Sequence, residues 1–249
     1  MKAMILAAGL GSRMLPLTAN TPKPLLKAGG RSLIEHHIYN LAEAGITEIV
    51  INHFYLGEQI EQALGNGSAF GVRIAYSPEI ERMETAGGII RALALLGDES
   101  FIVISADIWT QFPFASLRPV DGEQVLARLV MVNNPEHHAG GDFHLDQSGL
   151  LIQPPAESGL VRCTYSGISV MHPQLFRGYP EAPLPLRPLL TAAMPRHQLQ
   201  GQLYTGPWAD IGTPARLQEL DTALALAKPR VETSRNLGSD PHNLLIRIV

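Results

Sequence analysis

Short apolar runs alternate along the chain with segments in which apolar residues recur every three or four positions. The apolar runs are typical of strands buried on both faces and cover residues 3–8, 48–52, 72–76, 101–105, 125–132 and 163–172. The periodic segments predict helices over residues 33–44, 57–64, 85–96, 185–194 and 214–227. This alternation predicts an α/β protein in which a mostly parallel mixed sheet lies between two layers of helices.

Local signals mark the ends of several predicted elements. Ser32 and Glu35 are spaced as a capping box, which starts a helix at residue 33, and Gly45 is suited to end that helix. Residues 146–149 (D-Q-S-G) predict a tight turn between two short strands. The segment 154–159 is rich in proline and polar residues, and we predict that it is mobile and forms part of a lid.

The stretch from residue 6 to residue 26 carries the strongest chemical signal. It directly follows the first apolar run and contains Gly9, Gly11, Arg13 and Lys23. Glycines let backbone N–H groups approach an anion closely, and the two cations can neutralise further phosphate oxygens. We therefore predict a phosphate-binding loop here rather than an ordinary surface loop.

Two better-known phosphate loops do not fit this stretch. A dinucleotide-binding loop needs G-x-G-x-x-G opening a helix, but Met14 holds the third glycine position and Pro16 would interrupt the helix. The P-loop string G-x-x-x-x-G-K-[ST] does not occur in the chain. A pyridine-nucleotide oxidoreductase is therefore disfavoured.

Two aspartates are candidate metal ligands. Asp107 comes just after the predicted strand at 101–105, and Asp210 comes just before the turn that opens the last helix. Open α/β sheets bind ligands beyond the carboxyl ends of their strands, and aspartate is a hard oxygen ligand suited to Mg²⁺. From the residues alone, a turn or cap role for each aspartate stays open.

Five further residues are candidates for the site, and four of them have a structural alternative. Thr85 and Gly87 lie at a helix start, where glycine permits either close approach of a base or ribose, or tight helix–sheet packing. Asp142 lies in a polar loop and can accept hydrogen bonds from a sugar. Gly167 indicates either close approach by a sugar or a bulge, and Trp208 either lines a sugar pocket or packs in the core.

Composition and charge narrow the class of protein. The 249 residues are 45% hydrophobic and 17% charged, so we predict one domain over 1–227 and a tail of unknown role over 228–249. The net charge of -4 disfavours a nucleic-acid partner. No apolar run approaches the roughly 20 residues that cross a bilayer, and no signal peptide is recognisable. We therefore predict a cytoplasmic protein with no membrane partner, in which the single cysteine, Cys163, is a core residue.

Residues 9–25 together read G-x-G-x-R-M-x-P-L-T-x-x-x-P-K-P-L. This string resembles the signature of the sugar-1-phosphate nucleotidyltransferases, whose fold is a Rossmann-like (GT-A-like) three-layer α/β sandwich. The resemblance continues through roughly the first 227 residues. Within the family, Asn52-His53 and the run 165–170 look most like the N-acetylmuramate α-1-phosphate uridylyltransferases.

The resemblance implies a reaction and a site. UTP and a sugar 1-phosphate, here N-acetylmuramate 1-phosphate, would give a UDP-sugar and pyrophosphate with Mg²⁺ as cofactor, in a monomer or weak homo-oligomer. It implies that Arg13 and Lys23 are catalytic and that Asp107 and Asp210 hold the metal. The implied nucleotide-binding residues are Ala8, Gly9, Gly11, Ser12, Arg13, Lys23, Thr85 and Gly87. The implied sugar-binding residues are Ser105, Asp142, Gly167 and Trp208.

One motif departs from the family pattern. The chain reads Ser105-Ala106-Asp107 where the muramate-type enzymes usually read N-G-D, and the shorter serine would reach a sugar only through water. A mannose-1-phosphate guanylyltransferase and a glucose-1-phosphate uridylyl- or thymidylyltransferase remain alternatives. A non-catalytic sugar-nucleotide sensor is another, but it would be expected to lose Lys23 or the aspartates. The absence of hexapeptide repeats weighs against the bifunctional N-acetylglucosamine-1-phosphate uridylyltransferases.

Overall fold

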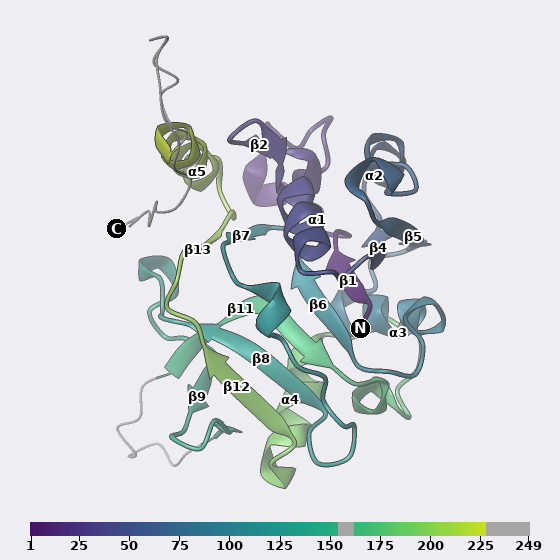
Figure 1. Ribbon diagram of the computed structural model, residues 1–249, viewed down its shortest axis with the longest axis vertical. Coiled ribbons are helices and arrows are strands. Elements are labelled where there is room, and N and C mark those ends of the chain that lie inside the picture. The colour runs from purple at the N-terminus through teal and green to yellow at the C-terminus, as the bar shows by residue number, and fades with distance from the viewer. Residues whose placement is uncertain (154–161, 228–249) are drawn as a thin grey trace, which may run out of the picture.

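The computed structural model describes residues 1–153 and 162–227, and its centre is one mixed β-sheet (Figure 1). The proposed lid segment 154–159 and the tail 228–249 lie outside the described residues. Within these ranges the sheet has nine strands, in the order β10-β9-β11-β6-β1-β4-β5, with β8 paired to β11 and β12 paired to β8. The strands are β1 Ala3–Leu6, β4 Glu48–His53, β5 Arg73–Pro78, β6 Phe101–Ser105, β8 Ala127–Val132, β9 Phe143–Leu145, β10 Leu151–Ile152, β11 Arg162–Met171 and β12 Leu199–Leu203.

The half of the sheet that contains the first strand is parallel. β1 lies between β6 and β4, and β5 continues the parallel order beyond β4. β11 then pairs antiparallel with both β6 and β8, which makes the sheet mixed. This arrangement confirms the predicted Rossmann-like α/β class and puts the carboxyl ends of β1, β4 and β6 at one edge.

Helices cover both faces of the sheet, as the pattern of apolar runs predicted. The helices are α1 Leu33–Glu43, α2 Gly57–Leu64, α3 Glu84–Leu96, α4 Leu186–Ala193 and α5 Pro214–Ala227. Ala3 and Ile5 of β1 pack in a core with α1 and α2, whereas Met4 packs in a second core with α3 and α4. Because successive strand residues face opposite layers, a strand buried on both sides must be apolar throughout.

The capping box at the start of α1 is present. The Glu35 side chain accepts a hydrogen bond from the Ser32 backbone N–H at 2.6 Å, and the Glu35 N–H donates to Ser32 Oγ at 3.4 Å. The helix ends before Gly45, whose φ is +76°. The start and end that we predicted for this helix are therefore confirmed to within one residue.

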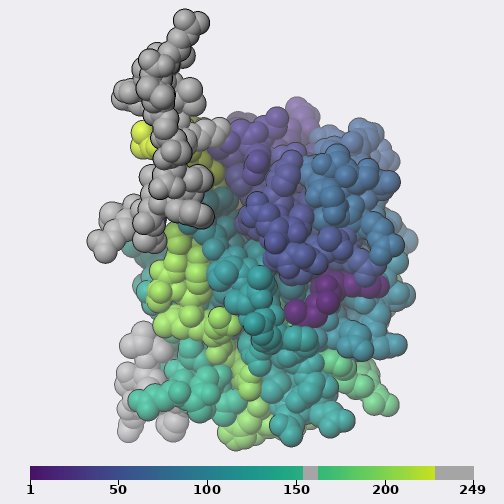
Figure 2. All heavy atoms as spheres, viewed as in Figure 1, coloured from purple at the N-terminus to yellow at the C-terminus, as the bar shows by residue number. Residues whose placement is uncertain are grey.

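Several short strands escaped the sequence analysis. β7 (Ile108–Thr110) and β13 (Trp208–Asp210) form an antiparallel ribbon, and β2 (Lys27–Ala28) pairs with β3 (Arg31–Ser32). β12 was also missed, because its sequence L-Q-G-Q-L has little apolar surface. The pairing of β12 with β8 and of β13 with β7 places late residues against the middle of the chain, as Figure 2 shows for the yellow-green and teal atoms.

A third, smaller core joins the last helix to the start of the chain. Leu217 and Leu220 of α5 pack with Met14 and Leu26, which both belong to the predicted phosphate-binding stretch 6–26. The Gly29 N–H also donates to the Asp221 carboxylate at 2.8 Å. The far end of the described chain thus supports the loop near its beginning. No helix in the described ranges is long and apolar enough to span a membrane.

Candidate active site

The predicted phosphate loop lines a cavity at the carboxyl ends of the parallel strands. The cavity has a volume of about 400 Å³. Its lining comprises Leu6, Ala7, Ala8, Gly9, Leu10, Gly11, Ser12, Arg13, Met14, Lys23, Pro24, Asn52, Glu79, Arg82, Glu84, Thr85, Ser105, Ala106, Asp107 and Gly212. We call it the loop cavity. It collects seven of the eight predicted nucleotide-binding residues, together with Ser105 and Asp107.

Gly11 holds the turn of this loop. Its φ is +64°, and a Cβ there would lie 2.9 Å from Thr18 Cγ2 and 3.2 Å from Lys23 Cβ. The Thr18 hydroxyl donates to the Gly11 carbonyl at 2.8 Å and so braces the same turn. Gly9 differs, because a Cβ there would meet nothing within 4 Å. The loop is therefore closed against Thr18 at Gly11 and open at Gly9.

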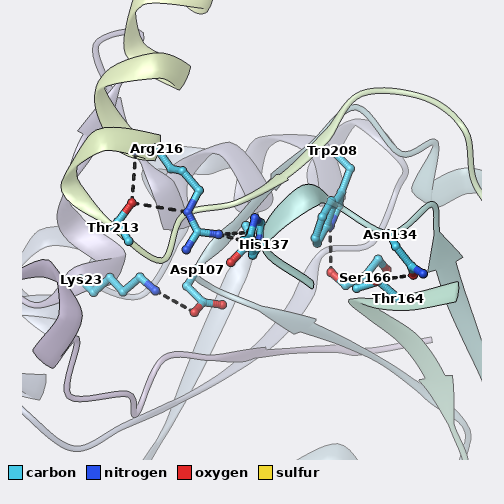
Figure 3. Close-up of polar contacts among 10 residues, drawn as sticks. Lys23, Asp107, Asn134, His137, Thr164, Ser166, Trp208, Thr213 and Arg216 are labelled. Atoms are coloured by element: carbon cyan, nitrogen blue, oxygen red, sulfur yellow. Dashed lines mark hydrogen bonds and ion pairs between the residues drawn. The ribbon is translucent and has the colours of Figure 1, made fainter. Parts of the chain in front are cut away.

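Lys23 and Asp107 face each other across the loop cavity. Lys23 Nζ donates to Asp107 Oδ2 at 2.7 Å (Figure 3). The side chain of Lys23 is 9% exposed, whereas that of Asp107 is 46% exposed. The short helical turn that carries Lys23 has Pro22 before it and Pro24 within it, which restricts the backbone around the lysine. The structure thus joins the loop cation to the carboxylate at the end of β6.

Asp210 lies on the strand next to Asp107. It is opposite Ile108 in the β13–β7 ribbon, and the Ile211 N–H donates to the Asp107 carbonyl at 2.7 Å. A Cβ on Gly212, which lines the loop cavity, would lie 3.2 Å from Asp210 Oδ2. The ribbon therefore brings Asp210 next to the backbone of Asp107, although Asp210 itself lines a second cavity and not the loop cavity.

The carboxylate of Asp210 already has two side-chain neighbours, one arginine and one histidine. Arg216 donates to Asp210 Oδ1, and His137 Nε2 lies 2.7 Å from the same oxygen. Arg216 Nη1 also lies 2.7 Å from His137 Nε2, and Figure 3 shows both side chains beside the Lys23–Asp107 pair. The sequence analysis assigned neither neighbour to the site, because Arg216 and His137 are far from each other in the chain and carry no motif that links them.

The two aspartates fit a divalent metal that is shared with a substrate. Within the described ranges, no group of three or more His, Cys, Asp or Glu residues could hold a metal ion by itself. Mg²⁺ is usually held by one or two carboxylates together with substrate phosphates. Asp107 and Asp210 therefore suit Mg²⁺ bound with a nucleotide better than a fully protein-bound ion.

The far end of the loop cavity is polar and built by side chains that the sequence analysis did not assign to the site. Asn52 donates to the buried carboxylate of Glu79 at 2.6 Å, and its Oδ1 accepts from the Ala7 N–H at 3.1 Å. Glu84 adopts a left-handed conformation (φ +57°) where α3 begins, next to Thr85. Asn52 lies at the end of β4 and Glu79 follows β5, and the sequence analysis used Asn52 only for the family resemblance.

Gly87 lies outside the loop cavity lining. Its N–H donates to the Leu184 carbonyl at 3.1 Å, and a Cβ there would lie 2.3 Å from the Ala182 carbonyl oxygen. Tight packing therefore accounts for Gly87 without a ligand, and the expected nucleobase contact stays a prediction. The backbone that packs against Gly87, at Ala182, lies almost a hundred positions further along the chain.

A second cavity of about 770 Å³ adjoins the β13 strand. It is lined by Trp109, Val132, Asn133, Pro135, His137, Tyr204, Thr205, Gly206, Pro207, Trp208, Ala209, Asp210, Arg216, Glu219, Leu220 and Ala223. Trp208 lies in this lining, and its indole N–H donates to the Ser166 carbonyl at 2.9 Å (Figure 3). Aromatic and polar side chains line it together, and we call it the ribbon cavity.

Two predicted sugar ligands lie outside both cavity linings. Asp142 accepts from the Tyr165 N–H at 2.9 Å and lies 3.3 Å from Arg187 Nη1, so its oxygens tie the end of β9 to β11 and α4. Gly167 lies where the β11–β8 register shifts, with φ +84°, and a Cβ there would lie 2.9 Å from Ser105 Oγ. The bulge reading accounts for Gly167, and its role at the site is to leave room for Ser105.

Comparisons with known proteins agree with this geometry. The sequence model of the Nucleotidyl transferase family matches residues 2–139. The chain is 48% identical over 229 residues to an N-acetylmuramate alpha-1-phosphate uridylyltransferase of Neisseria meningitidis, covering 88% of this chain and 96% of the relative. It is 33% identical over 236 residues to the protein of that description in Caulobacter vibrioides, covering 90% and 97%.

A solved structure is similar in fold. A candidate glucose-1-phosphate thymidylyltransferase from Bacillus anthracis superimposes with a TM-score of 0.77 at 24% identity, covering 96% of this chain and 98% of that one. This likeness supports the fold alone, whereas the family match and the relatives rest on sequence. The chain belongs to the sugar-1-phosphate nucleotidyltransferase family.

Proposed function

We propose that the protein transfers the uridylyl group of UTP to N-acetylmuramate α-1-phosphate, giving UDP-N-acetylmuramate and pyrophosphate. The observation that carries the proposal is the contact between Lys23 and Asp107 inside a cavity walled by the signature loop. The names of the two relatives support uridine and N-acetylmuramate as the substrates. An enzyme of this kind would use the cytoplasmic UTP pool and could serve the recycling of cell-wall sugars.

The reaction needs charge neutralisation more than acid–base chemistry. A nucleoside triphosphate and a sugar phosphate bring several like charges together, and two unit charges 4 Å apart repel by about 1 kcal/mol in water and about 4 kcal/mol at an effective dielectric of 20. In the proposal, the backbone of residues 9–13 and the Arg13 side chain would hold the leaving β and γ phosphates, which their presence in the cavity lining supports. Lys23, in the same lining, would contact the α-phosphate and the incoming sugar phosphate.

In the proposed step, an oxygen of the sugar phosphate attacks the α-phosphorus of UTP. The new P–O bond forms as the bond to the pyrophosphate oxygen breaks, and pyrophosphate leaves with that electron pair. No protein nucleophile or general base is required, because the attacking phosphate is already ionised. Catalysis then consists of positioning and electrostatic stabilisation by the loop and Lys23.

We propose Mg²⁺ as the cofactor, held by Asp107 and Asp210. A bound Mg²⁺ would neutralise phosphate charge and polarise the reacting phosphoryl group. Asp107 is half exposed, and Asp210 lies opposite Ile108 in the ribbon, so both would contact an ion held between them in place of Lys23 on Asp107 and Arg216 on Asp210. Among the residues that the structure describes, these two carboxylates are the protein's contribution to the proposed metal site.

Pyrophosphate release across a panel of substrates tests the proposal. UTP, GTP and dTTP would each be paired with N-acetylmuramate, N-acetylglucosamine, glucose and mannose 1-phosphates, with Mg²⁺ and in a parallel arm with EDTA. We expect turnover with UTP and N-acetylmuramate 1-phosphate to exceed every other pair and to stop in EDTA. Highest turnover with GTP and mannose 1-phosphate would replace the proposed substrates, and no turnover with any pair would favour a sensor.

A further inference from the structure

The outer edge of β7 is bonded by side chains of α1 rather than by another strand. At the two ends of the β13–β7 ribbon, the Ile211 N–H donates to the Asp107 carbonyl and the Gln111 N–H donates to the Pro207 carbonyl. The residues that bond to β13 from the β7 side are therefore the odd-numbered ones. The carbonyls of Ile108 and Thr110 therefore point to the other side, since alternate residues of a strand bond in opposite directions. His37 and Asn40 of α1 meet these two carbonyls, at 2.9 and 3.3 Å.

The chemistry of His37 is that of a fixed hydrogen-bond donor. The residue is 1% exposed, and burial lowers its pKa to about 4, so the ring is neutral at physiological pH. A neutral imidazole has one N–H, and a carbonyl only accepts, so the network assigns that proton to Nε2. Nδ1 then has no hydrogen-bond partner within the described part of the chain.

A histidine in this place is not explained by packing alone. Its neighbours on the same helix, Ile34, Ile38 and Leu41, are apolar and pack in the core with β1 and β4. An apolar side chain at position 37 would fill the space without an unpaired Nδ1. It would, however, leave the buried Ile108 carbonyl without this hydrogen-bond donor. His37 therefore satisfies the carbonyl of Ile108, the residue that directly follows Asp107.

We propose that His37 is a positioning residue for the metal site. It fixes the first residue of β7 against α1, which sets the place of the Asp107 carboxylate and, through the ribbon, that of Asp210. Outer partners that orient metal ligands typically change metal affinity 10- to 100-fold when they are removed. The inference rests on the proposed function, because it needs Asp107 to be a metal ligand. Asn40 makes the longer of the two hydrogen bonds, to the Thr110 carbonyl of the same strand.

The test compares three variants of the full-length protein. His37→Leu removes the donor and keeps the bulk, and His37→Gln restores an N–H at similar reach. His36→Leu is the matched control, because His36 makes the same kind of bond at 2.9 Å but to the Ala28 carbonyl of β2 instead of a β7 carbonyl. Mn²⁺ affinity is measured by water-proton relaxation enhancement with a UTP analogue that cannot react, and circular dichroism follows the fold.

We expect His37→Leu to weaken Mn²⁺ binding about tenfold or more, whereas His37→Gln and His36→Leu stay within about threefold of the wild type. Equal affinity in wild type and His37→Leu would overturn the inference, as would equal losses in the Leu and Gln variants. Absence of Mn²⁺ binding by the wild type would instead overturn the proposed metal site, and with it this inference. Should His37→Leu not fold, His37→Asn takes its place, because its amide is too short to reach Ile108, and Asn40→Ala gives a second measurement. Loss of Mn²⁺ affinity in His37→Asn, with unchanged affinity in His37→Gln, would support the proposal whether or not Asn40→Ala changes the affinity. Unchanged affinity in His37→Asn would overturn it.

Discussion

Lys23 is the residue on which the proposed chemistry depends most. It is buried at the loop cavity and contacts Asp107, so no other cation of the loop can take its place. We predict that Lys23→Ala lowers kcat by about 10²- to 10³-fold, the usual effect of removing a transition-state contact. The fold should survive, because the Asp107 carboxylate that loses its partner is half exposed. Lys27→Ala, at an exposed position in β2, is the control and should keep wild-type kcat. Near-normal turnover in Lys23→Ala would remove the lysine from the mechanism.

Removing Arg216 is predicted to favour binding of the proposed Mg²⁺, whereas removing Lys23 is predicted to lower activity. Its guanidinium contacts Asp210 and so competes with any cation for that carboxylate. Partly exposed ion pairs contribute up to about 1 kcal/mol, which corresponds to about fivefold in a binding constant. We therefore predict that Arg216→Gln lowers the Mg²⁺ concentration needed for half-maximal turnover by up to about fivefold. Arg187→Gln, which removes a cation from Asp142 instead, should leave that concentration unchanged. A higher Mg²⁺ requirement in Arg216→Gln would show that the arginine orients Asp210 rather than competing for it.

At the scale of the loop, its two glycines are predicted to differ. Gly11→Ala forces a side chain into a left-handed conformation and against Thr18, so it should lower the free energy of unfolding by about 1–2 kcal/mol. Gly9→Ala meets no neighbouring atom and should change that free energy by less than about 0.5 kcal/mol. Urea denaturation of both variants and the wild type measures the two effects. Equal destabilisation by the two substitutions would contradict the role of the loop turn.

Elements with strong local signals could be predicted from the sequence, and those defined by distant partners could not. The capping box of Ser32 and Glu35 fixes the start of α1 by local bonds, so its position followed from the sequence. β7 and β13 have three residues each, too few for an apolar period, and they exist because they pair with each other across a hundred positions. Their ribbon is nevertheless what brings Asp210 to Asp107.

The candidate site shows the same division. The loop residues and Asp107 were predicted, because a motif and a strand end mark them, and the loop cavity contains them. Gly87 could not be assigned from its own surroundings, since the backbone at Ala182 and Leu184 decides its role. Arg216 and His137 carry no local signal, and their contact with Asp210 depends on how α5 packs on the loop. Sequence reasoning thus found the groups of the site but not the contacts that restrain them.

At the scale of the whole molecule, one buried group makes stability depend on pH. Burial lowers the pKa of His37 from 6.5 to about 4. Between about pH 6.5 and pH 4 the unfolded chain binds a proton at this residue that the folded chain does not bind, so the free energy of unfolding falls as the pH falls through this window. The pKa difference corresponds to a loss of about 3 kcal/mol once the pH reaches about 4, and to none above about pH 7. Urea denaturation at the two pH values measures the loss, and in His37→Gln, which cannot titrate there, it should be about 3 kcal/mol smaller than in the wild type. Other groups titrate equally in both proteins and cancel in the comparison, so equal losses would show that His37 is protonated in the folded protein or that its ring is not buried.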